Sequence, residues 1–132
     1  LVYQEFIEWM SRDKELLAFG SLMHHQKQPY KRLVDDWIST MKDKRHRARE
    51  IPNDGTFERE YYLKNVRLNR NPNHHIRFVP DGTFQNDNLL YGNTLAIISV
   101  GKHLFVTRIE SAEVAHSYRN FFNLAWQSAK SL

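Results

Sequence analysis

The segment 88–100, NLLYGNTLAIISV, decides the fold of this chain. Two apolar runs flank Gly92-Asn93, and glycine supplies the positive φ that a two-residue hairpin turn needs at its first central position. The second run is apolar at both odd and even positions, which is typical of a strand covered on both faces. The segment therefore predicts a hairpin that ends in a central strand of a sheet with helices on both sides.

Apolar runs on either side of this hairpin predict a mixed α/β sheet. Downstream, Gly101-Lys102 predicts a second hairpin turn before a strand at 103–109. Upstream, the expected strands alternate with helices, an order that favours parallel pairing, at 15–21, 48–52 and 76–79. The closely spaced strands at the end of the chain instead predict an antiparallel meander.

Four helices are expected around this sheet. Apolar residues at helical spacing predict the first from the start to about Arg12. Pro29 suits the first turn of a second helix, which is expected to run into a basic stretch. Thr56 is the predicted N-cap of the third helix and Ser111 that of the last, whose wide aromatic-rich stripe requires deep docking on the sheet.

The composition bounds the class of protein. A chain of 132 residues with 41% apolar and 26% charged residues predicts one globular domain, residues 1–132. The absence of cysteine excludes thiol nucleophiles and iron–sulfur clusters, and no cofactor is predicted. The longest apolar stretch, 95–100, is far shorter than the ~20 residues of a membrane helix, so we expect a cytoplasmic protein with no membrane partner.

A short basic segment carries much of the formal net charge of +4. Residues 42–49 hold five lysines and arginines against one aspartate. We therefore select Lys42, Lys44, Arg45 and Arg47 as candidates for contacts with nucleic-acid phosphates, which add salt-dependent affinity without base specificity. The alternative is the solvated end of the second helix, where cations suit the helix dipole.

Histidine pairs stand at two places, His24-His25 and His74-His75, but no metal site is predicted. The first pair follows one expected strand and the second opens another, which places them at opposite ends of a parallel sheet. Exposed loop histidines are the interpretation we favour. His25-x-Lys27 matches two residues of the H-x-K-x4-D phosphodiesterase motif, but the aspartate place is Arg32.

Two arginines, Arg49 and Arg77, lie inside short predicted strands, where a charged side chain needs a partner. The adjacent Glu50 points to the other face of the sheet and cannot pair with Arg49 there. Two interpretations stay open: pairing with an acid across the core or a dimer interface, and contact with an anionic or sugar-like ligand.

The order of these segments resembles the effector-binding domain of TrmB-like transcriptional regulators, which has a phospholipase D-like α/β fold. The hairpin NLLYGNTLAIISV and the closing strand and helix, FVTRIESAEVAHSYRNFFNLAWQSA, carry the resemblance most strongly. ELLAFGS, AREIP and IRFVP are similar to the three earlier strands of that domain, so the resemblance covers about residues 3–129.

The resemblance implies a domain that senses a small molecule and often dimerises. Members of the family bind DNA through an N-terminal winged-helix domain, and this chain shows none, so that domain is expected to precede residue 1. The implied partners are a small-molecule effector (a sugar or an anion), a second copy of the chain, and DNA through the missing domain.

The resemblance also allows a test for catalysis. If Gly92 or Asn93 takes the aspartate place of the phosphodiesterase motif, the histidine place falls on Gln85 or Asn86. The lysine place then falls two residues later, on Asp87 or Asn88. Neither the nucleophile nor the phosphate-binding lysine is present, so we expect a vacated catalytic site and no enzymatic activity.

Polar residues at the vacated site are candidates for ligand binding. Asn86, Asn88 and Ser21, which ends the first strand, join Arg49 and Arg77 in this set. The alternative functions are a phospholipase D-like phosphodiesterase or nuclease, and a nucleic-acid-binding module that uses the segment 42–49.

Overall fold

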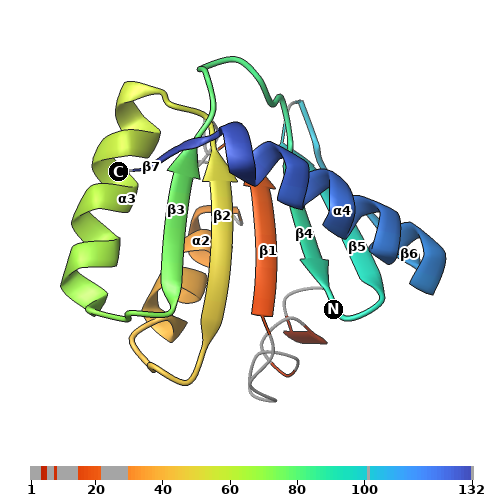
Figure 1. The fold of residues 1–132 in the computed structure, drawn as a ribbon, viewed down its shortest axis with the longest axis horizontal. Helices are drawn as coiled ribbons and strands as arrows, with labels where there is room; N and C mark the ends of the chain where they lie inside the picture. Colours follow the sequence, from red (N-terminus) through yellow and green to blue (C-terminus); the bar gives the residue numbers. More distant parts are fainter. Residues whose placement is uncertain (1–3, 6–7, 9–14, 22–29, 101, 132) are drawn as a thin grey trace.

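The computed structural model describes the chain except for residues 1–3, 6–7, 9–14, 22–29, 101 and 132. Within the described residues, one sheet has the strand order β6-β5-β4-β1-β2-β3-β7, with α4 across one face and α2 and α3 on the other (Figure 1). The strands are β1 (Glu15–Gly20), β2 (Arg47–Pro52), β3 (His74–Phe78), β4 (Asp87–Tyr91), β5 (Thr94–Val100), β6 (Leu104–Glu110) and β7 (Lys130–Ser131), and the helices are α2 (Tyr30–Thr40), α3 (Thr56–Asn69) and α4 (Ala112–Ser128).

The sheet combines both predicted modes of pairing. Strands β1, β2 and β3 are parallel, while β4, β5 and β6 form an antiparallel meander whose first strand pairs with β1. The predicted mixed α/β class is therefore confirmed. Between β3 and β4 the chain passes over the carboxyl ends of β2 and β1 (Figure 1). We call this segment, residues 79–86, the crossing loop.

Alternating side chains build two separate cores. Leu16 of β1 packs with α2 and α3, whereas the next residue, Leu17, packs with α4. Trp37 and Tyr62 are the large aromatic residues of the first core, and Phe122 fills the second. All five side chains are at most 6% exposed, so water is excluded from both faces of the sheet around β1.

Strand β5 is buried on both faces as predicted, but it is not central. Leu95 belongs to the core under α4, and Ala96 to the core on the opposite face. The centre of the sheet is β1, and β5 lies one strand from the edge formed by β6. Cover by helices, rather than a central position, explains its apolar character.

Several boundaries differ from the predicted ones. Strand β3 begins at His74, two residues earlier than expected, and the short strand β7, which pairs with β3, was not predicted. Gly55, not Thr56, is the N-cap of α3, because the extended backbone of a cap falls on Gly55. The predicted cap of α4 is confirmed: the hydroxyl of Ser111 accepts a hydrogen bond from the Val114 amide at 3.2 Å.

The predicted first helix is only partly visible. Gln4, Glu5 and Glu8 are helical, and the rest of that prediction lies outside the described residues. Among the helices that are described, none has the length and apolar character needed to cross a membrane.

Candidate functional site

A cleft of about 490 Å³ opens at the carboxyl ends of β1 and β2, between the first turn of α3 and the crossing loop. Open α/β sheets bind ligands at this edge, where the strand order reverses. Here β1 and β2 connect toward β3, and the crossing loop returns over this edge to β4, so the direction of the chain along the sheet reverses there. The lining residues are Ser21, Asn53, Gly55, Thr56, Phe57, Glu58, Asp81, Gly82, Phe84 and Gln85.

Asn53 fixes the crossing loop beneath the cleft. Its side chain, 2% exposed, donates to the carbonyl of Phe84 and accepts from the amide of Phe84, each at 2.9 Å. Its own backbone amide donates to the carbonyl of Gly20 at 3.1 Å. Both ends of the side-chain amide are therefore committed to the loop, so Asn53 positions the site and leaves ligand contacts to its neighbours.

Two carboxylates converge on Gly55. A Cβ atom placed at Gly55 would clash with Oε2 of Glu58 and would lie 3.2 Å from Oδ1 of Asp81. Only a residue without a side chain leaves room for this approach. Glu58 is 5% exposed, and no hydrogen bond or ion pair joins its side chain to any described residue. The cleft thus holds a buried carboxylate that nothing described neutralises.

The nearby cation, Arg59, is already paired. Its guanidinium donates to both carboxylate oxygens of Asp54, at 2.7 and 2.9 Å, and lies 4.9 Å from the ring centre of Phe78. These hydrogen bonds lower the pKa of Asp54 and raise the pKa of Arg59. The Arg59–Asp54 ion pair links the first turn of α3 to the turn after β2. Arg59 is therefore not available as an ion-pair partner for Glu58.

Three of the predicted ligand residues do come together beside the cleft. Ser21 lines it, and the backbone amide of Ser21 donates to the carbonyl of Asn86 at 3.1 Å. The side chain of Asn86 donates to Asn88 at 3.0 Å, and that of Asn88 donates to the carbonyl of Phe19 at 2.9 Å. The two asparagines therefore hold β4 against β1. Ligand binding by these residues stays a prediction.

The predicted arginines lie elsewhere, on the face covered by α4. Arg49 pairs with Glu15 at 3.0 Å, and its guanidinium lies 5.2 Å from the ring centre of Phe122. Arg77 donates to the carbonyl of Trp126 at 2.8 Å and lies 4.6 Å from its ring centre. Both cations thus have partners within the fold, and the structure does not bring them to Ser21.

One histidine is not an exposed loop residue as expected. His74 is 4% exposed at the start of β3, and its Nε2 forms a short contact with the carboxylate of Glu50 on β2. The hydroxyl of Tyr62 donates to the same carboxylate at 3.1 Å. The register that places Glu50 opposite Ile76 brings the acid within reach of His74. The neighbouring His75 is exposed.

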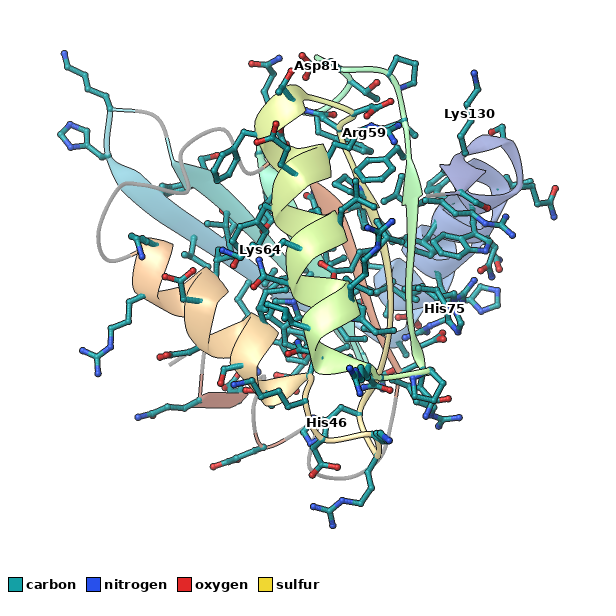
Figure 2. All side chains as sticks on the ribbon, turned by 90° about the vertical axis from the view of Figure 1, so that its left-hand side faces the viewer. His46, Arg59, Lys64, His75, Asp81 and Lys130 are labelled. Carbon is teal, nitrogen blue, oxygen red and sulfur yellow. The ribbon has the colours of Figure 1, made fainter. Side chains whose placement is uncertain are left out.

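The opposite end of the parallel strands is basic. Lys42 and Lys44 follow α2, while Lys64, Arg67 and Arg70 lie on α3 and at its C-cap. All five are exposed, and none forms an ion pair with another described residue. We call them the basic surface. In Figure 2, Arg59 and Asp81 lie at one end of α3, and His46, in the loop that carries two of these lysines, lies at the other.

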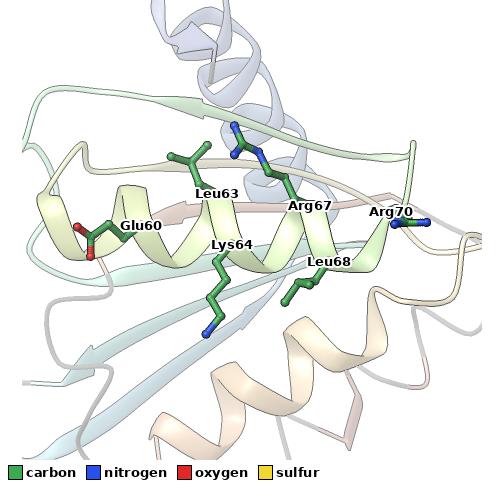
Figure 3. Close-up of a pocket in the computed structure, with 6 residues that line it drawn as sticks. All are labelled: Glu60, Leu63, Lys64, Arg67, Leu68 and Arg70. Atoms are coloured by element: carbon green, nitrogen blue, oxygen red, sulfur yellow. The ribbon is translucent and has the colours of Figure 1, made fainter.

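The α3 part of this surface includes an open depression of about 850 Å³. Its lining combines three cations with one acid, Glu60, and with Leu63 and Leu68, the last of which is 67% exposed. Lys64 and Leu68 point to one side of α3, and Leu63 and Arg67 to the other (Figure 3). Arg70 adopts the left-handed conformation, with φ 50°, that ends the helix. A broad, open patch of this kind suits an extended polyanion better than a small molecule.

Asparagines join the two parts of the basic surface. The side chain of Asn71 donates to the carbonyls of Met41 at 3.0 Å, Asp43 at 3.2 Å and His46 at 3.0 Å. The side chain of Asn73 donates to the carbonyl of Lys44 at 2.8 Å. These bonds satisfy the carbonyls of a loop. The second helix was expected to run into the basic stretch, but α2 ends at Thr40, just before it.

The other two predicted phosphate-binding residues are placed differently. Arg45 is held by Asp43 through hydrogen bonds of 2.7 to 3.2 Å. These bonds lower the pKa of Asp43, which therefore stays ionised. Arg47 is exposed at the first position of β2. Contact of any of these residues with nucleic acid stays a prediction.

Among the described residues, no group of three or more histidine, aspartate or glutamate residues is arranged so that it could hold a metal ion. His24, His25 and Lys27, which carried the other histidine hypotheses, lie outside the described residues.

The sequence reasoning missed the acids of the cleft and the cations of α3. Asn53-Asp54-Gly55 and Pro80-Asp81-Gly82 were recognisable as turns that follow parallel strands. Because the carboxyl ends of parallel strands share one edge, these turns were bound to lie close together. Glu58 was recognisable too, in the first turn of α3.

Comparison with known proteins supports a relationship at the level of fold. No family model and no curated protein sequence matches the chain. Among solved structures it is similar to TrmBL2, described as an archaeal chromatin protein with a novel mode of DNA binding. The TM-score is 0.67 at 14% identity, over 98% of this chain and 50% of TrmBL2. The chain thus spans half the length of that protein and shares its fold there.

Proposed function

We propose that this chain is a non-catalytic domain of a TrmB-like transcriptional regulator that senses a ligand, dimerises, or does both, with a phospholipase D-like fold. The main observation in support of this proposal is the cleft at the carboxyl ends of β1 and β2, in a fold that the chain shares with TrmBL2. Such a regulator would contact DNA mainly through a further domain. The cleft is the effector site, because it combines a chain reversal with carboxylates and aromatic walls.

The vacated motif supports a role without catalysis. The positions that would hold the phosphodiesterase histidine and lysine fall around Asn86 and Asn88. An amide cannot act as the nucleophile of phosphoryl transfer, and it does not carry the positive charge that steadies a phosphate. Asn86 and Asn88 instead form hydrogen bonds that secure β4.

Ligand sensing is tested by thermal unfolding of the chain with a panel of neutral sugars, amines and small anions. We expect at least one class to raise the melting temperature in a saturable manner, since a ligand that binds only the folded state stabilises it. Gly55→Ala places a methyl group between the two carboxylates and should abolish the shift. Absence of any shift, or a shift unchanged in Gly55→Ala, would contradict this effector site.

The outer face of α4 supports dimerisation with a second copy. Phe121 and Leu124 are 63% and 64% exposed, one helical turn apart. The only lysine, arginine or acid within residues 114–129 is Arg119, whose guanidinium donates to the carbonyl of Gly92 at 2.8 Å. An uncharged face with two large apolar side chains is self-complementary, as a two-fold interface requires.

Dimerisation is tested by sedimentation velocity. Phe121→Ser with Leu124→Ser should convert a dimer into a monomer, whereas Leu68→Ser, which removes an equally exposed leucine from α3, should not. A wild-type chain that is monomeric at about 100 μM would remove dimerisation from the proposal.

Direct contact with nucleic acid is a second candidate function, favoured by the basic surface. Its five cations come from two segments joined by Asn71 and Asn73 and have no ion pairs with other described residues. Phosphates bind such cations by releasing counterions. The basic surface would then add affinity without base specificity to a regulator that reads sequence elsewhere.

A further inference from the structure

We propose that the effector of the cleft carries a protonated amine, which Glu58 and Asp81 hold between them. The inference rests on the proposed effector site and names the chemical class of its ligand. It follows from a buried carboxylate that has no partner among the described residues and from the geometry around Gly55.

The argument begins with the cost of burying Glu58. Glu58 is 5% exposed and has no hydrogen bond or ion pair with a described residue, and buried charges in proteins are normally paired. The place of Glu58 in the first turn of α3 supplies part of the compensation for its charge through the helix dipole. A cation would supply the rest, but Arg59 is bonded to Asp54. Among the described residues no other cation supplies it, so we infer that a bound ligand does.

The geometry selects a compact cation. Oε2 of Glu58 and Oδ1 of Asp81 both approach the point that a Cβ atom on Gly55 would occupy. An ammonium group has three donors on a small sphere and can bond both oxygens at once. The same charges repel anions, which argues against the anionic effector considered from the sequence.

The walls of the cleft suit the rest of an organic ligand. Phe57 is 38% exposed and lines the cleft, with its ring stacked on Tyr61 at 5.8 Å. Phe84 forms a second aromatic wall, 5.8 Å from Phe19. Aromatic faces attract cations and cover alkyl chains. A bare divalent ion prefers six or more oxygen ligands, and the described residues gather no group of three acidic or histidine side chains.

The experiment measures thermal unfolding of the chain with 1,4-diaminobutane and with its neutral counterpart, 1,4-butanediol, at constant ionic strength. We expect a saturable rise in melting temperature with the diamine and none with the diol. Glu58→Gln should weaken the apparent affinity at least tenfold, while Glu60→Gln, an exposed acid two residues along α3, should leave it unchanged. If Glu58→Gln does not fold by circular dichroism, Asp81→Asn takes its place.

The proposal of an amine effector is overturned if 1,4-butanediol raises the melting temperature as much as 1,4-diaminobutane does. It is also overturned if Mg²⁺ or Ca²⁺ gives the same rise, or if Glu58→Gln binds the diamine with wild-type affinity. If a neutral sugar stabilises the wild type but not Gly55→Ala, and the diamine has no effect, the amine class of the ligand is wrong but the cleft remains the effector site. Failure of the whole panel would overturn both.

Discussion

The two ends of the parallel strands differ in charge and in shape. At the carboxyl ends, Glu58 and Asp81 face a cleft of about 490 Å³. At the amino ends, lysines and arginines from the loop after α2 and from α3 form the exposed basic surface. The net charge of +4 is therefore unevenly distributed, with acids at one end of the sheet and bases at the other. The acidic end would attract small cations and the basic end extended polyanions.

Helix α3 explains part of this difference. Its first turn contains Glu58, and its last turn contains Arg67. Acids at the start and bases at the end both complement the helix dipole, so local stability favours this polarity. The turns that precede α3 and β4 add aspartates because Asn-Asp-Gly and Pro-Asp-Gly are favourable turn sequences. The contrast between the two ends thus arises from ordinary rules of helix and turn formation.

The largest expected effect concerns the stability of the sheet between the two ends, where Glu50 contacts His74. Glu50→Ala leaves the buried His74 without its carboxylate partner between β2 and β3, and a buried polar group left unsatisfied costs about 1–3 kcal/mol, more where a charge is involved. Tyr62→Phe removes only one hydrogen bond from the same carboxylate and should cost about 1 kcal/mol. Urea denaturation measures both. Equal losses of stability in the two variants would contradict the central role of the pair.

The next effect tests the basic end. Lys64→Ala, Arg67→Ala and Arg70→Ala combined should weaken binding to a duplex of about 30 base pairs by roughly 10- to 100-fold. The slope of log K against log salt should become shallower by about 0.9 for each phosphate that the variant no longer neutralises. Fluorescence anisotropy at several salt concentrations measures both quantities.

The matched control is Lys130→Ala, which removes a cation distant from His46 in Figure 2. Its slope should stay at the wild-type value. An equal change of slope in this control would show that net charge, rather than the basic surface, governs binding.

A smaller effect in the opposite direction is expected from the acid within the basic end. Asp43→Asn releases Arg45 from its ion pair and removes a negative charge. Because hydrogen bonds from Arg45 hold the pKa of Asp43 far below its ordinary value, the acid is fully ionised at neutral pH. Affinity for the duplex should rise about two- to fivefold, with a steeper salt slope. A decrease would indicate that Arg45 needs Asp43 to be held in position.

The smallest effect concerns pH at the acidic end. Hydrogen bonds from Arg59 lower the pKa of Asp54 in the folded state. This pair therefore contributes its full stability above the ordinary pKa of 3.8, and the contribution decreases as pH falls through the lower folded value. Asp54→Asn should remove this part of the acid dependence in urea titrations from neutral pH to about pH 2. An identical pH dependence in the variant would exclude the pair as a source.

The elements of the fold followed from local patterns, whereas the sites depended on pairings distant in sequence. The hairpin at Gly92 and the cap at Ser111 are short-range signals, and both were predicted. His74 was misjudged because its partner, Glu50, is on another strand, and the burial of both depends on the register of β2 and β3. The loop that follows α2 also depends on a distant residue, since Asn71 donates hydrogen bonds to its carbonyls.

Helix α3 also has a mechanical consequence. Its 14 residues form a rod about 21 Å long, with Gly55 at one end and Arg70 at the other. Where packed helices shift, they slide as units by small amounts. A tilt that followed occupation of the cleft would therefore sweep the far tip of the rod sideways, carrying Arg67 and Arg70 with it. The two ends of the sheet are thus joined by a single secondary-structure element.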